Sequence, residues 1–358
     1  MVDIEVYIMN ALVLEDIGTI KYKEVEKPIP QEGEVLVKVM ACGVCGSDIP
    51  RSYKDGAHNM PLIIGHEFAG VVESVGDNVD AKWLKKPVGV FPLIPCNKCR
   101  PCLNRQYEMC KSYSYLGSRR DGGFAQYVSV PEWNLIELPQ NVQMESAAML
   151  EPMAVAVHAM RRVNIKPTDK IVVCGLGTIG ILLTMFLLER NLSNIYVIGN
   201  KDFQKNMVTE LGISKENYCD AKKESVYDFV MDKTDGAGAD VFFECVGNNE
   251  TVSLAVDCAA AAGSVCMVGN PRSDMNFTQN TYWKILRNQL TVTGTWNSSF
   301  YGDGDDWRYV LYRLTQKLID PSRLITHRYE LSEITEGLEI MRDKSEDYIK
   351  IMAYPNGK

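Results

Sequence analysis

The pattern of hydrophobic and polar residues divides the chain into segments that predict different secondary structure. Before about residue 155, short β-branched runs such as "EVLVKVMACGVC" and "GHEFAGVVESVG" are separated by Gly, Asp and Asn turns, which is typical of a β-rich domain. Between about residues 165 and 295, apolar runs ending in glycine ("KIVVCG", "IYVIG", "ADVFFECVG", "GSVCMVG") alternate with segments such as "IGILLTMFLLERN" and "ETVSLAVDCAAAA", which are typical of helices. Buried strands alternating with helices predict an α/β domain with a doubly wound parallel sheet.

The tail of the chain follows a third pattern. It contains an amphipathic helix, "DWRYVLYRLTQKLI", and a closing strand, "YIKIMAYP". We therefore divide the chain into residues 1–155, 156–296 and 297–358. Met9 begins the first expected strand, so residues 1–8 are interpreted as an extension.

Composition narrows the classes of function. The length of 358 residues fits two domains, and 46% hydrophobic residues are enough for full cores. A net charge of −8 argues against a nucleic-acid or anionic-membrane partner, although a local pocket can still bind an anion. No span approaches the ~20 apolar residues of a membrane helix, and the N-terminus does not resemble a signal peptide. Eleven cysteines without an export signal indicate reduced thiols, and we expect a cytoplasmic protein.

A glycine-rich turn predicts a dinucleotide site. In "IVVCGLGTIGILLTMFL", Gly175, Gly177 and Gly180 follow a strand and open a helix, whose N-terminus attracts a pyrophosphate. An ordinary strand–helix turn is the alternative, because the motif alone is weak. The expected cofactor-binding set is completed by Thr178 and Ile179 in the turn, Asn200 and Lys201 after the second strand, and Val246, Val268 and Gly269 after later strands.

The end of the second strand bears on which nucleotide binds. NAD sites usually carry an acidic residue there, to hold the ribose 2′-hydroxyl. The stretch "YVIGNK" has Gly199 instead, followed by Asn200, which can donate hydrogen bonds, and by the cationic Lys201. These residues suit a 2′-phosphate, so we predict NADP rather than NAD. In the alternative, Lys201 is a solvated loop residue and Asp202 holds the NAD ribose.

Four cysteines in one short loop predict a structural metal site. "CNKCRPCLNRQYEMC" supplies Cys96, Cys99, Cys102 and Cys110 within residues 96–110. Four thiolates can close a tetrahedral zinc shell and leave no position for substrate. An iron–sulfur cluster is the chemical alternative.

A second, dispersed set predicts an open metal site. Cys45 in "CGVCGSD", His66 and Glu67 in "GHEFAG" and Glu151 in "LEP" offer mixed sulfur, nitrogen and oxygen ligands on separate loops, as in catalytic zinc sites. Alternatively, His66 is an ordinary hydrogen-bonded histidine and the carboxylates lie at the surface. Cys42 and Cys45 also form a C-x-x-C pair, which allows a redox interpretation.

The ordered motifs resemble the zinc-dependent medium-chain dehydrogenase/reductase family over almost the whole chain. They are "CGVCGSD", "GHEFAGVVESVG", "CNKCRPC…C", "DGGFAQYV", "LEPMAVAVHA" and "GLGTIG". Within the family, "GAHNMPLIIGHEF", "LGSRRDGGFAQY" and "ILRNQLTVTGTWNSS" resemble dehydrogenases of polyol phosphates such as galactitol 1-phosphate. The same features recur more loosely in sorbitol, threonine and butanediol dehydrogenases.

This resemblance implies a GroES-like β-barrel catalytic domain, built from the N-terminal part and the tail, beside a Rossmann domain. It implies two zinc ions per chain. The catalytic zinc is expected on Cys45, His66 and a carboxylate, with Glu67 and Glu151 both near it, and the structural zinc on the four-cysteine loop. The expected reaction is hydride transfer from a secondary alcohol of a polyol or polyol phosphate to a nicotinamide, in a homodimer or homotetramer.

The remaining site residues each have two interpretations. Ser47 passes the hydroxyl proton outward, or is a structural turn residue. His58 lies at the mouth of the site, or in a surface loop. Arg119 and its neighbour Arg120 hold a substrate phosphate, or form a solvated hairpin tip. Trp296 walls the pocket, with Asn297 and Ser298 facing hydroxyls, or is a core residue.

A different class of function stays open at this stage. The chain could combine a zinc-ribbon interaction module with a nucleotide-sensing domain and have no catalytic activity. The intact set of Cys45, His66, Glu67 and Glu151 argues against this alternative.

Overall fold

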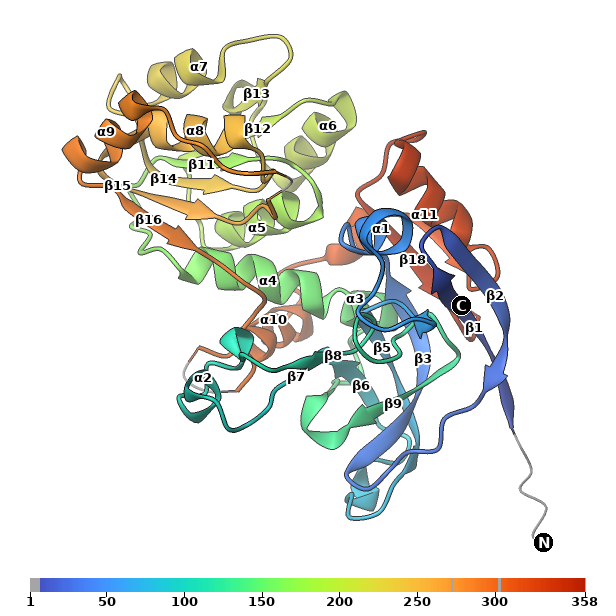
Figure 1. The fold of residues 1–358 in the computed structure, drawn as a ribbon. Helices are drawn as coiled ribbons and strands as arrows, with labels where there is room; N and C mark the ends of the chain where they lie inside the picture. Colours follow the sequence, from blue (N-terminus) through green and yellow to red (C-terminus); the bar gives the residue numbers. More distant parts are fainter. Residues whose placement is uncertain (1–6, 272, 302–303, 358) are drawn as a thin grey trace, which may run out of the picture. The chain divides into compact units, whose positions relative to one another are not determined.

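The computed structural model describes residues 7–271, 273–301 and 304–357. The chain divides into two compact units (Figure 1). The first comprises Met1–Glu151 together with Ser299–Lys358, and the second is Pro152–Ser298. The sequence placed these divisions at 155/156 and 296/297. Most of the expected N-terminal extension lies outside the described residues, and the first strand begins at Ile8.

The described part of the first unit contains three sheets, the smallest of which pairs β7 with β8. Strands in the order β10-β6-β5-β3-β18-β17, with β9 also paired to β3, form a seven-stranded sheet, and β2-β1-β4 form a three-stranded one. The strands are β1 Ile8–Asp16, β2 Thr19–Glu26, β3 Glu34–Gly43, β4 Leu62–Ile63, β5 Glu67–Val75, β6 Pro87–Val90, β7 Leu93–Ile94, β8 Ser114–Tyr115, β9 Tyr127–Pro131, β10 Leu135–Glu137, β17 Ile325–Glu330 and β18 Lys350–Tyr354. The C-terminal strand β18 lies antiparallel to β3, so the tail completes the sheet of the N-terminal part.

Short helices and turns connect these strands. The helices of this unit are α1 Asp48–Pro50, α2 Arg100–Leu103, α3 Met144–Ala148, α10 Asp306–Thr315 and α11 Ile334–Asp343. A π-helical turn, η1, spans Arg51–Asp55, and 3₁₀ turns are η2 Ala81–Trp83, η3 Tyr107–Met109, η4 Glu132–Asn134 and η6 Pro321–Leu324. The expected amphipathic helix of the tail is α10, which buries Trp307, Val310 and Leu314. The Asp305 carboxylate caps its first turn by accepting from the backbone N–H of Arg308.

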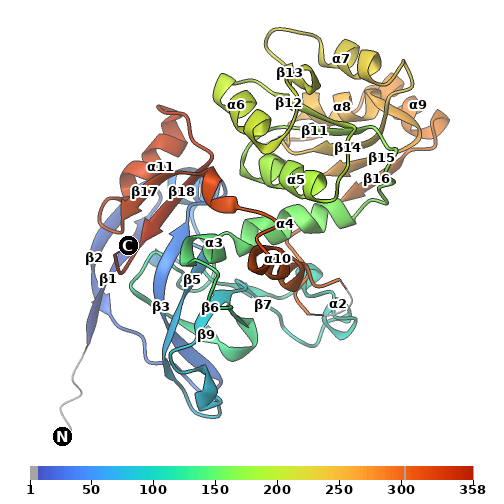
Figure 2. The same ribbon diagram turned by 180° about the vertical axis from the view of Figure 1, so that it is seen from behind.

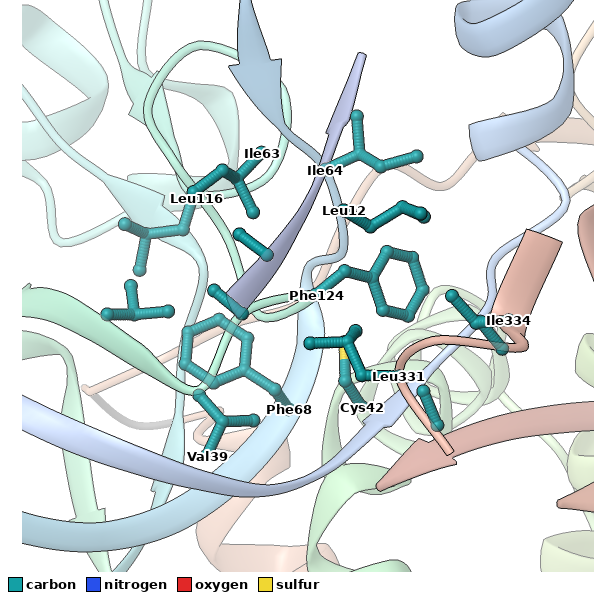
Figure 3. Close-up of a cluster of buried hydrophobic side chains, with 14 of the residues drawn as sticks. Leu12, Val39, Cys42, Ile63, Ile64, Phe68, Leu116, Phe124, Leu331 and Ile334 are labelled. Atoms are coloured by element: carbon teal, nitrogen blue, oxygen red, sulfur yellow. The ribbon is translucent and has the colours of Figure 1, made fainter. Parts of the chain in front are cut away.

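The core of the first unit joins the two ends of the chain. Leu12 and Phe124 pack in one buried cluster with Leu331 and Ile334, from the loop before α11 and its first turn (Figure 3). Cys42 is fully buried in the same cluster, and burial raises the pKa of its thiol well above the ordinary value. This environment disfavours the redox interpretation of Cys42 and Cys45, because the thiolate is the reactive form.

The second unit is a doubly wound α/β fold. Its six parallel strands run in the order β13-β12-β11-β14-β15-β16. They are β11 Ile171–Cys174, β12 Ile195–Gly199, β13 Tyr218–Asp220, β14 Ala239–Glu244, β15 Ala259–Met267 and β16 Thr291–Gly294. The helices are α4 Leu150–Arg161, which begins at the end of the first unit, α5 Thr178–Glu189, α6 Asp202–Leu211, α7 Val226–Lys233, α8 Asn249–Asp257 and α9 Gln279–Arg287, with a 3₁₀ turn η5 at Lys215–Asn217. The opposed helices α5 and α8 cover opposite faces of the sheet (Figures 1 and 2).

The predicted fold class is confirmed, but two helix boundaries were wrong. The tail helix was expected to reach Ile319, whereas α10 ends at Thr315. The segment "ETVSLAVDCAAAA" was expected to be helical throughout, whereas α8 ends at Asp257 and its alanines open β15. Ala259 pairs with Ala239 of β14, so tertiary strand pairing overrides the helix propensity of alanine there. Among the described residues, no helix has both the length and the apolar character needed to cross a membrane.

Candidate active site and metal centres

The four-cysteine loop forms a compact sulfur cluster. The Sγ atoms of Cys96, Cys99, Cys102 and Cys110 all lie within 4.8 Å of one another. Cys99 caps the short helix α2, and its Sγ is 3.4 Å from Cys102 Sγ and 3.9 Å from Cys110 Sγ. Hydrogen bonds from the backbone N–H groups of Lys111 and Cys102 lower the pKa of Cys99 to about 6, which favours its thiolate. This donor set fits a closed tetrahedral zinc site.

A second cluster follows from the pairing of β3 with β5. Gly43 at the end of β3 lies opposite Glu67 at the start of β5, so the turn after β3 and the residue before β5 meet. The ligand atoms of Cys45, His66 and Glu67 consequently lie within 4.8 Å of one another. His66 and Glu67 are buried and Cys45 is partly exposed, so the set fits a metal that can be reached from solvent.

The buried side chain of Asp48 faces the Nδ1 atom of the His66 ring. Asp48 Oδ1 lies 3.5 Å from His66 Nδ1, and Asp48 also accepts from the backbone N–H of Cys45 (3.0 Å) and from the Arg51 guanidinium (2.6 Å). Although burial alone would raise the pKa of Asp48, the facing His66 and Arg51 hold it below the ordinary value. A carboxylate in this position fixes the orientation of an imidazole ligand. Asp48 was not among the predicted site residues, although it ends the quoted "CGVCGSD" motif.

The carboxylate of Glu67 has a buried cationic partner. Lys350, from the C-terminal strand β18, donates to Glu67 Oε2, and its Nζ also donates to the carbonyl of Val44 at 3.0 Å. Both side chains are 1% exposed. Burial lowers the pKa of Lys350, but the facing Glu67 reverses this and raises the pKa above its ordinary value. Sequence reasoning missed Lys350, because a single lysine in a closing strand carries no motif.

Glu151 lies outside the three-residue group. It is buried in the first turn of α4 and accepts a hydrogen bond from the Tyr115 hydroxyl at 3.2 Å. The Tyr115 ring is in turn edge-on to His66, with 5.8 Å between centroids. Burial raises the pKa of Glu151 to about 7. The structure therefore groups Cys45, His66 and Glu67, whereas the role of Glu151 as a ligand stays a prediction.

The other expected residues of the first unit lie in loops. The Ser47 hydroxyl is 3.3 Å from Cys45 Sγ and donates to it. His58 is exposed. Arg120 forms an ion pair with Glu34 at 2.7 Å, whereas the Arg119 guanidinium stacks 4.6 Å from the Tyr113 ring. Both arginines line a pocket of about 520 Å³.

Two candidate substrate residues belong to the second unit. Trp296 is 54% exposed, so the alternative that it is a core residue was wrong. Asn297 has a left-handed backbone (φ 59°), and its neighbour Ser298 is fully buried. Their roles towards substrate stay predictions.

The glycine-rich turn has the features of a phosphate-binding loop. Gly175 has φ 99°, which glycine adopts readily, and a Cβ on Gly180 would lie 1.9 Å from the Gly175 carbonyl oxygen. In contrast, a Cβ on Gly177 would meet nothing within 4 Å, so the backbone there is open to a ligand. Gly177 caps α5, which begins at Thr178 and Ile179, and its N-terminus favours an anion.

The last residue of β12 is not acidic, and lysines follow it in the chain. Gly199 is the last residue of this strand, Asn200 follows it, and Lys201 caps α6. Lys205 lies one turn further along α6, with its Nζ 5.4 Å from the Tyr218 ring. Asp202, the alternative ribose ligand, has an exposed side chain that lies 3.6 Å from Lys223 Nζ.

The comparisons decide the family. An alcohol dehydrogenase GroES-like domain model matches residues 31–140, and a zinc-binding dehydrogenase model matches residues 178–316. Galactitol 1-phosphate 5-dehydrogenase of Escherichia coli K12 is 32% identical over 333 residues, which cover 92% of this chain and 95% of that protein. The chain belongs to the zinc-dependent medium-chain dehydrogenase/reductase family. It is an oxidoreductase of the zinc-type alcohol and polyol dehydrogenases, and the resemblance seen in its motifs is confirmed.

Other members of this zinc-dependent dehydrogenase family are also similar. Sorbitol dehydrogenase of Halalkalibacterium halodurans is 31% identical over 97% of this chain and 99% of that protein. The crystal structure of galactitol-1-phosphate dehydrogenase from E. coli superposes with a TM-score of 0.89 at 30% identity, covering 97% of this chain and 100% of that one.

Similar solved structures hold either nicotinamide cofactor. A putative zinc-binding dehydrogenase from Sinorhizobium meliloti 1021 bound to NADP has a TM-score of 0.88 at 26% identity, covering 98% of this chain and 100% of that one. An alcohol dehydrogenase (rspB) from E. coli CFT073 complexed with NADH has a TM-score of 0.88 at 25% identity, covering 97% of this chain and 99% of that one. The cofactor preference of this chain must therefore be argued from its own residues.

Proposed function

We propose that this chain is an NADP-preferring dehydrogenase that oxidises a secondary alcohol of a polyol phosphate. The observation that carries the proposal is the grouping of Cys45, His66 and Glu67 within 4.8 Å, with Asp48 behind His66. One sulfur, one nitrogen and one carboxylate donor, partly reachable from solvent, are a ligand set for catalytic rather than structural zinc.

The chain's own residues would divide the work at this site. Cys45, His66 and Glu67 would hold the catalytic zinc, with Glu151 close by, and the four-cysteine loop would hold the structural one. When bound, the catalytic zinc supplies a Lewis acid that favours loss of the proton from a secondary alcohol. Asp48 orients the His66 imidazole, and Lys350 balances the charge of Glu67. Ser47, two residues after Cys45, accepts the hydroxyl proton and passes it towards solvent.

Cations at the end of β12 support NADP. Gly199 has no side chain to bind a ribose hydroxyl or repel a phosphate. Lys201 stands at the N-terminus of α6, where phosphate is favoured, and Lys205 adds a charge on the next turn. Lys223 pairs with Asp220 at 2.8 Å and approaches Asp202, so the exposed Asp202 carboxylate is partly balanced.

The phosphorylated substrate is proposed from the relatives and from Arg119. Glu34 holds the guanidinium of Arg120, whereas the Arg119 guanidinium stacks on the Tyr113 ring and forms no ion pair among the described residues. His58, in the loop before β4, is a further substrate-binding residue proposed for the first unit. Trp296 and Asn297 are those proposed for the second unit. An unphosphorylated polyol is the second candidate, because a sorbitol dehydrogenase is nearly as similar.

We also propose a cytoplasmic homodimer or homotetramer. The edge strand β16 exposes Val292, and the preceding α9 exposes Tyr282, Trp283 and Leu286. An exposed strand edge beside large apolar side chains is a surface that a second copy can cover. None of the described cysteines forms a disulfide, and a reducing compartment disfavours disulfides. Sedimentation of the purified protein tests the assembly, and a monomer at micromolar concentration would overturn it.

Initial rates test the proposed activity. Galactitol 1-phosphate and free galactitol are each supplied with NADP⁺ or NAD⁺. Turnover confined to the phosphate with NADP⁺ is the expected result. Faster turnover with NAD⁺ would overturn the cofactor preference, and equal rates on both polyols would overturn the phosphate role of Arg119. No turnover on these or a wider alcohol panel, with a single zinc per chain, would instead favour a non-catalytic nucleotide sensor.

A further inference from the structure

A fully buried acidic residue ends β14 in the second unit. Glu244 is 0% exposed and takes no part in the chemistry proposed above. It lies where the sheet order changes direction, since β14 and β12 flank β11 on opposite sides. Ligands of doubly wound folds bind at the carboxyl ends of the strands beside this point.

Glu244 holds together the two loops that follow β14 and β15. Its Oε1 accepts from the backbone N–H groups of Val246 (2.8 Å) and Gly247 (2.9 Å), and from the Thr251 hydroxyl (2.8 Å). Its main-chain carbonyl accepts from the N–H groups of Val268 (2.8 Å) and Gly269 (2.9 Å). Val246, Val268 and Gly269, which are expected to contact the cofactor, therefore all donate to this residue, but of these three bonds only that of Val246 depends on the Glu244 side chain.

The two loops also pack backbone against backbone. A Cβ on Gly247 would lie 2.0 Å from the Asn270 carbonyl oxygen, and one on Gly269 would lie 2.2 Å from the Gly247 nitrogen. On the other side, a Cβ on Gly175 in the phosphate-binding turn would lie 2.6 Å from Val246 Cγ2. With so little free space, a shift of the loop at Val246 would move its neighbours as well.

Burying this carboxyl group costs folding free energy, so its presence in the core calls for an explanation. Oε2 is buried with no hydrogen-bond partner among the described residues, and an unpartnered buried oxygen is unfavourable. Apolar side chains fill the rest of this core, and a further one would avoid that cost. An apolar residue, however, could not accept from the two backbone N–H groups that converge on Oε1, whereas the Thr251 hydroxyl also has Asn248 Oδ1 within 2.9 Å.

We propose that Glu244 is a positioning residue that fixes the loops holding the nicotinamide half of the cofactor. The inference rests on the proposed dinucleotide site. With the pyrophosphate at the glycine-rich turn after β11 and the ribose 2′-position at the end of β12, the adenosine half lies on the β12 side. The other half of the dinucleotide then extends over the ends of β14 and β15, where Glu244 acts.

Binding to the whole cofactor and to its adenosine half tests this role. Purified, zinc-loaded wild type, Glu244→Ala, Glu244→Gln and Thr251→Val are titrated with NADPH and with adenosine 2′,5′-bisphosphate, and melting temperatures are recorded. We expect Glu244→Ala to weaken NADPH binding about tenfold or more, because several buried donors lose their acceptor. Binding of adenosine 2′,5′-bisphosphate should stay within about twofold, since that half lies across the sheet.

Two milder variants keep the test decisive if Glu244→Ala folds poorly. Glu244→Gln retains an acceptor oxygen and should bind NADPH within about threefold of wild type. Thr251→Val removes one donor and should weaken NADPH binding by a smaller factor, again without affecting the adenosine probe. General destabilisation would instead lower the melting temperature and weaken both probes alike.

The outcomes separate this inference from the proposed function. Unchanged NADPH binding in Glu244→Ala and Thr251→Val, or equal loss for both probes, would overturn the role of Glu244 while the cofactor site stood. A wild-type protein that bound neither NADPH nor NADH would overturn the cofactor site, and this inference with it.

Discussion

The Tyr218 ring occupies the space that a side chain at position 199 would need. A Cβ on Gly199 would lie 2.9 Å from Tyr218 Oη and 3.0 Å from Tyr218 Cε2. The Tyr218 hydroxyl donates to the Lys201 carbonyl at 3.2 Å, which holds the ring in place. This strand end therefore lacks the acidic residue usual at an NAD site, and the Tyr218 ring would clash with one at position 199.

This packing predicts that positions 199 and 218 are energetically coupled. Gly199→Ala should destabilise the fold by about 1–3 kcal/mol, because the new methyl group is overpacked against the ring. In a Tyr218→Ala background the same substitution should cost less, although Leu176 Cδ1 would still lie 3.0 Å from the new methyl group. Urea unfolding of the two single variants and the double variant measures the coupling. Additive free energies would show that the ring yields without strain.

Lys201→Ala should change cofactor preference. Loss of a charge-assisted contact with a 2′-phosphate is worth about 1.5–3 kcal/mol, so NADPH binding should weaken roughly ten- to hundredfold. NADH, which has no such phosphate, should bind as before. Fluorescence titration with both cofactors measures this, and Lys215→Ala, an exposed lysine elsewhere in the same unit, serves as the control. Equal losses for the two cofactors would remove the 2′-phosphate role.

Local sequence signals predicted the framework of both units. These signals are the glycine-rich turn, the alternation of buried strands with helices and the four-cysteine spacing. Each depends on residues that are close in the sequence, so it can be recognised without knowing the tertiary contacts. The β3–β5 register then places Cys45 beside His66 and Glu67, as the motif order suggested.

Contacts between distant segments were not predictable in this way. Lys350 meets Glu67 from 283 positions away, and only the pairing of β18 with β3 brings them together. Glu244 resembled any residue at a strand end until its hydrogen bonds were seen. The alanines of β15 were misassigned because strand pairing, rather than local propensity, decides their conformation.

The two metal sites should respond differently to the loss of one ligand. Cys45→Ala should abolish turnover and lower zinc to about one ion per chain, with the melting temperature nearly unchanged. Cys99→Ala should lower the melting temperature and solubility, because structural zinc contributes directly to folding free energy. Metal analysis and thermal unfolding of both variants measure this. Identical behaviour would contradict the division into catalytic and structural sites.

The ion pair between Lys350 and Glu67 should matter far more to stability than surface pairs. In protein stripped of zinc, Lys350→Met leaves the buried Glu67 carboxylate without a cation, which costs about 3–5 kcal/mol. Lys86→Met is the matched control, since Lys86 pairs with Glu137 at 2.6 Å with both side chains about half exposed. Its loss should cost below about 1 kcal/mol. Adding Glu67→Gln to Lys350→Met should recover part of the stability, because the unpaired charge is removed. Urea unfolding of these variants measures the losses in free energy of unfolding. If Lys350→Met lost as little as Lys86→Met, the buried Glu67 carboxylate would not need Lys350 for its stability.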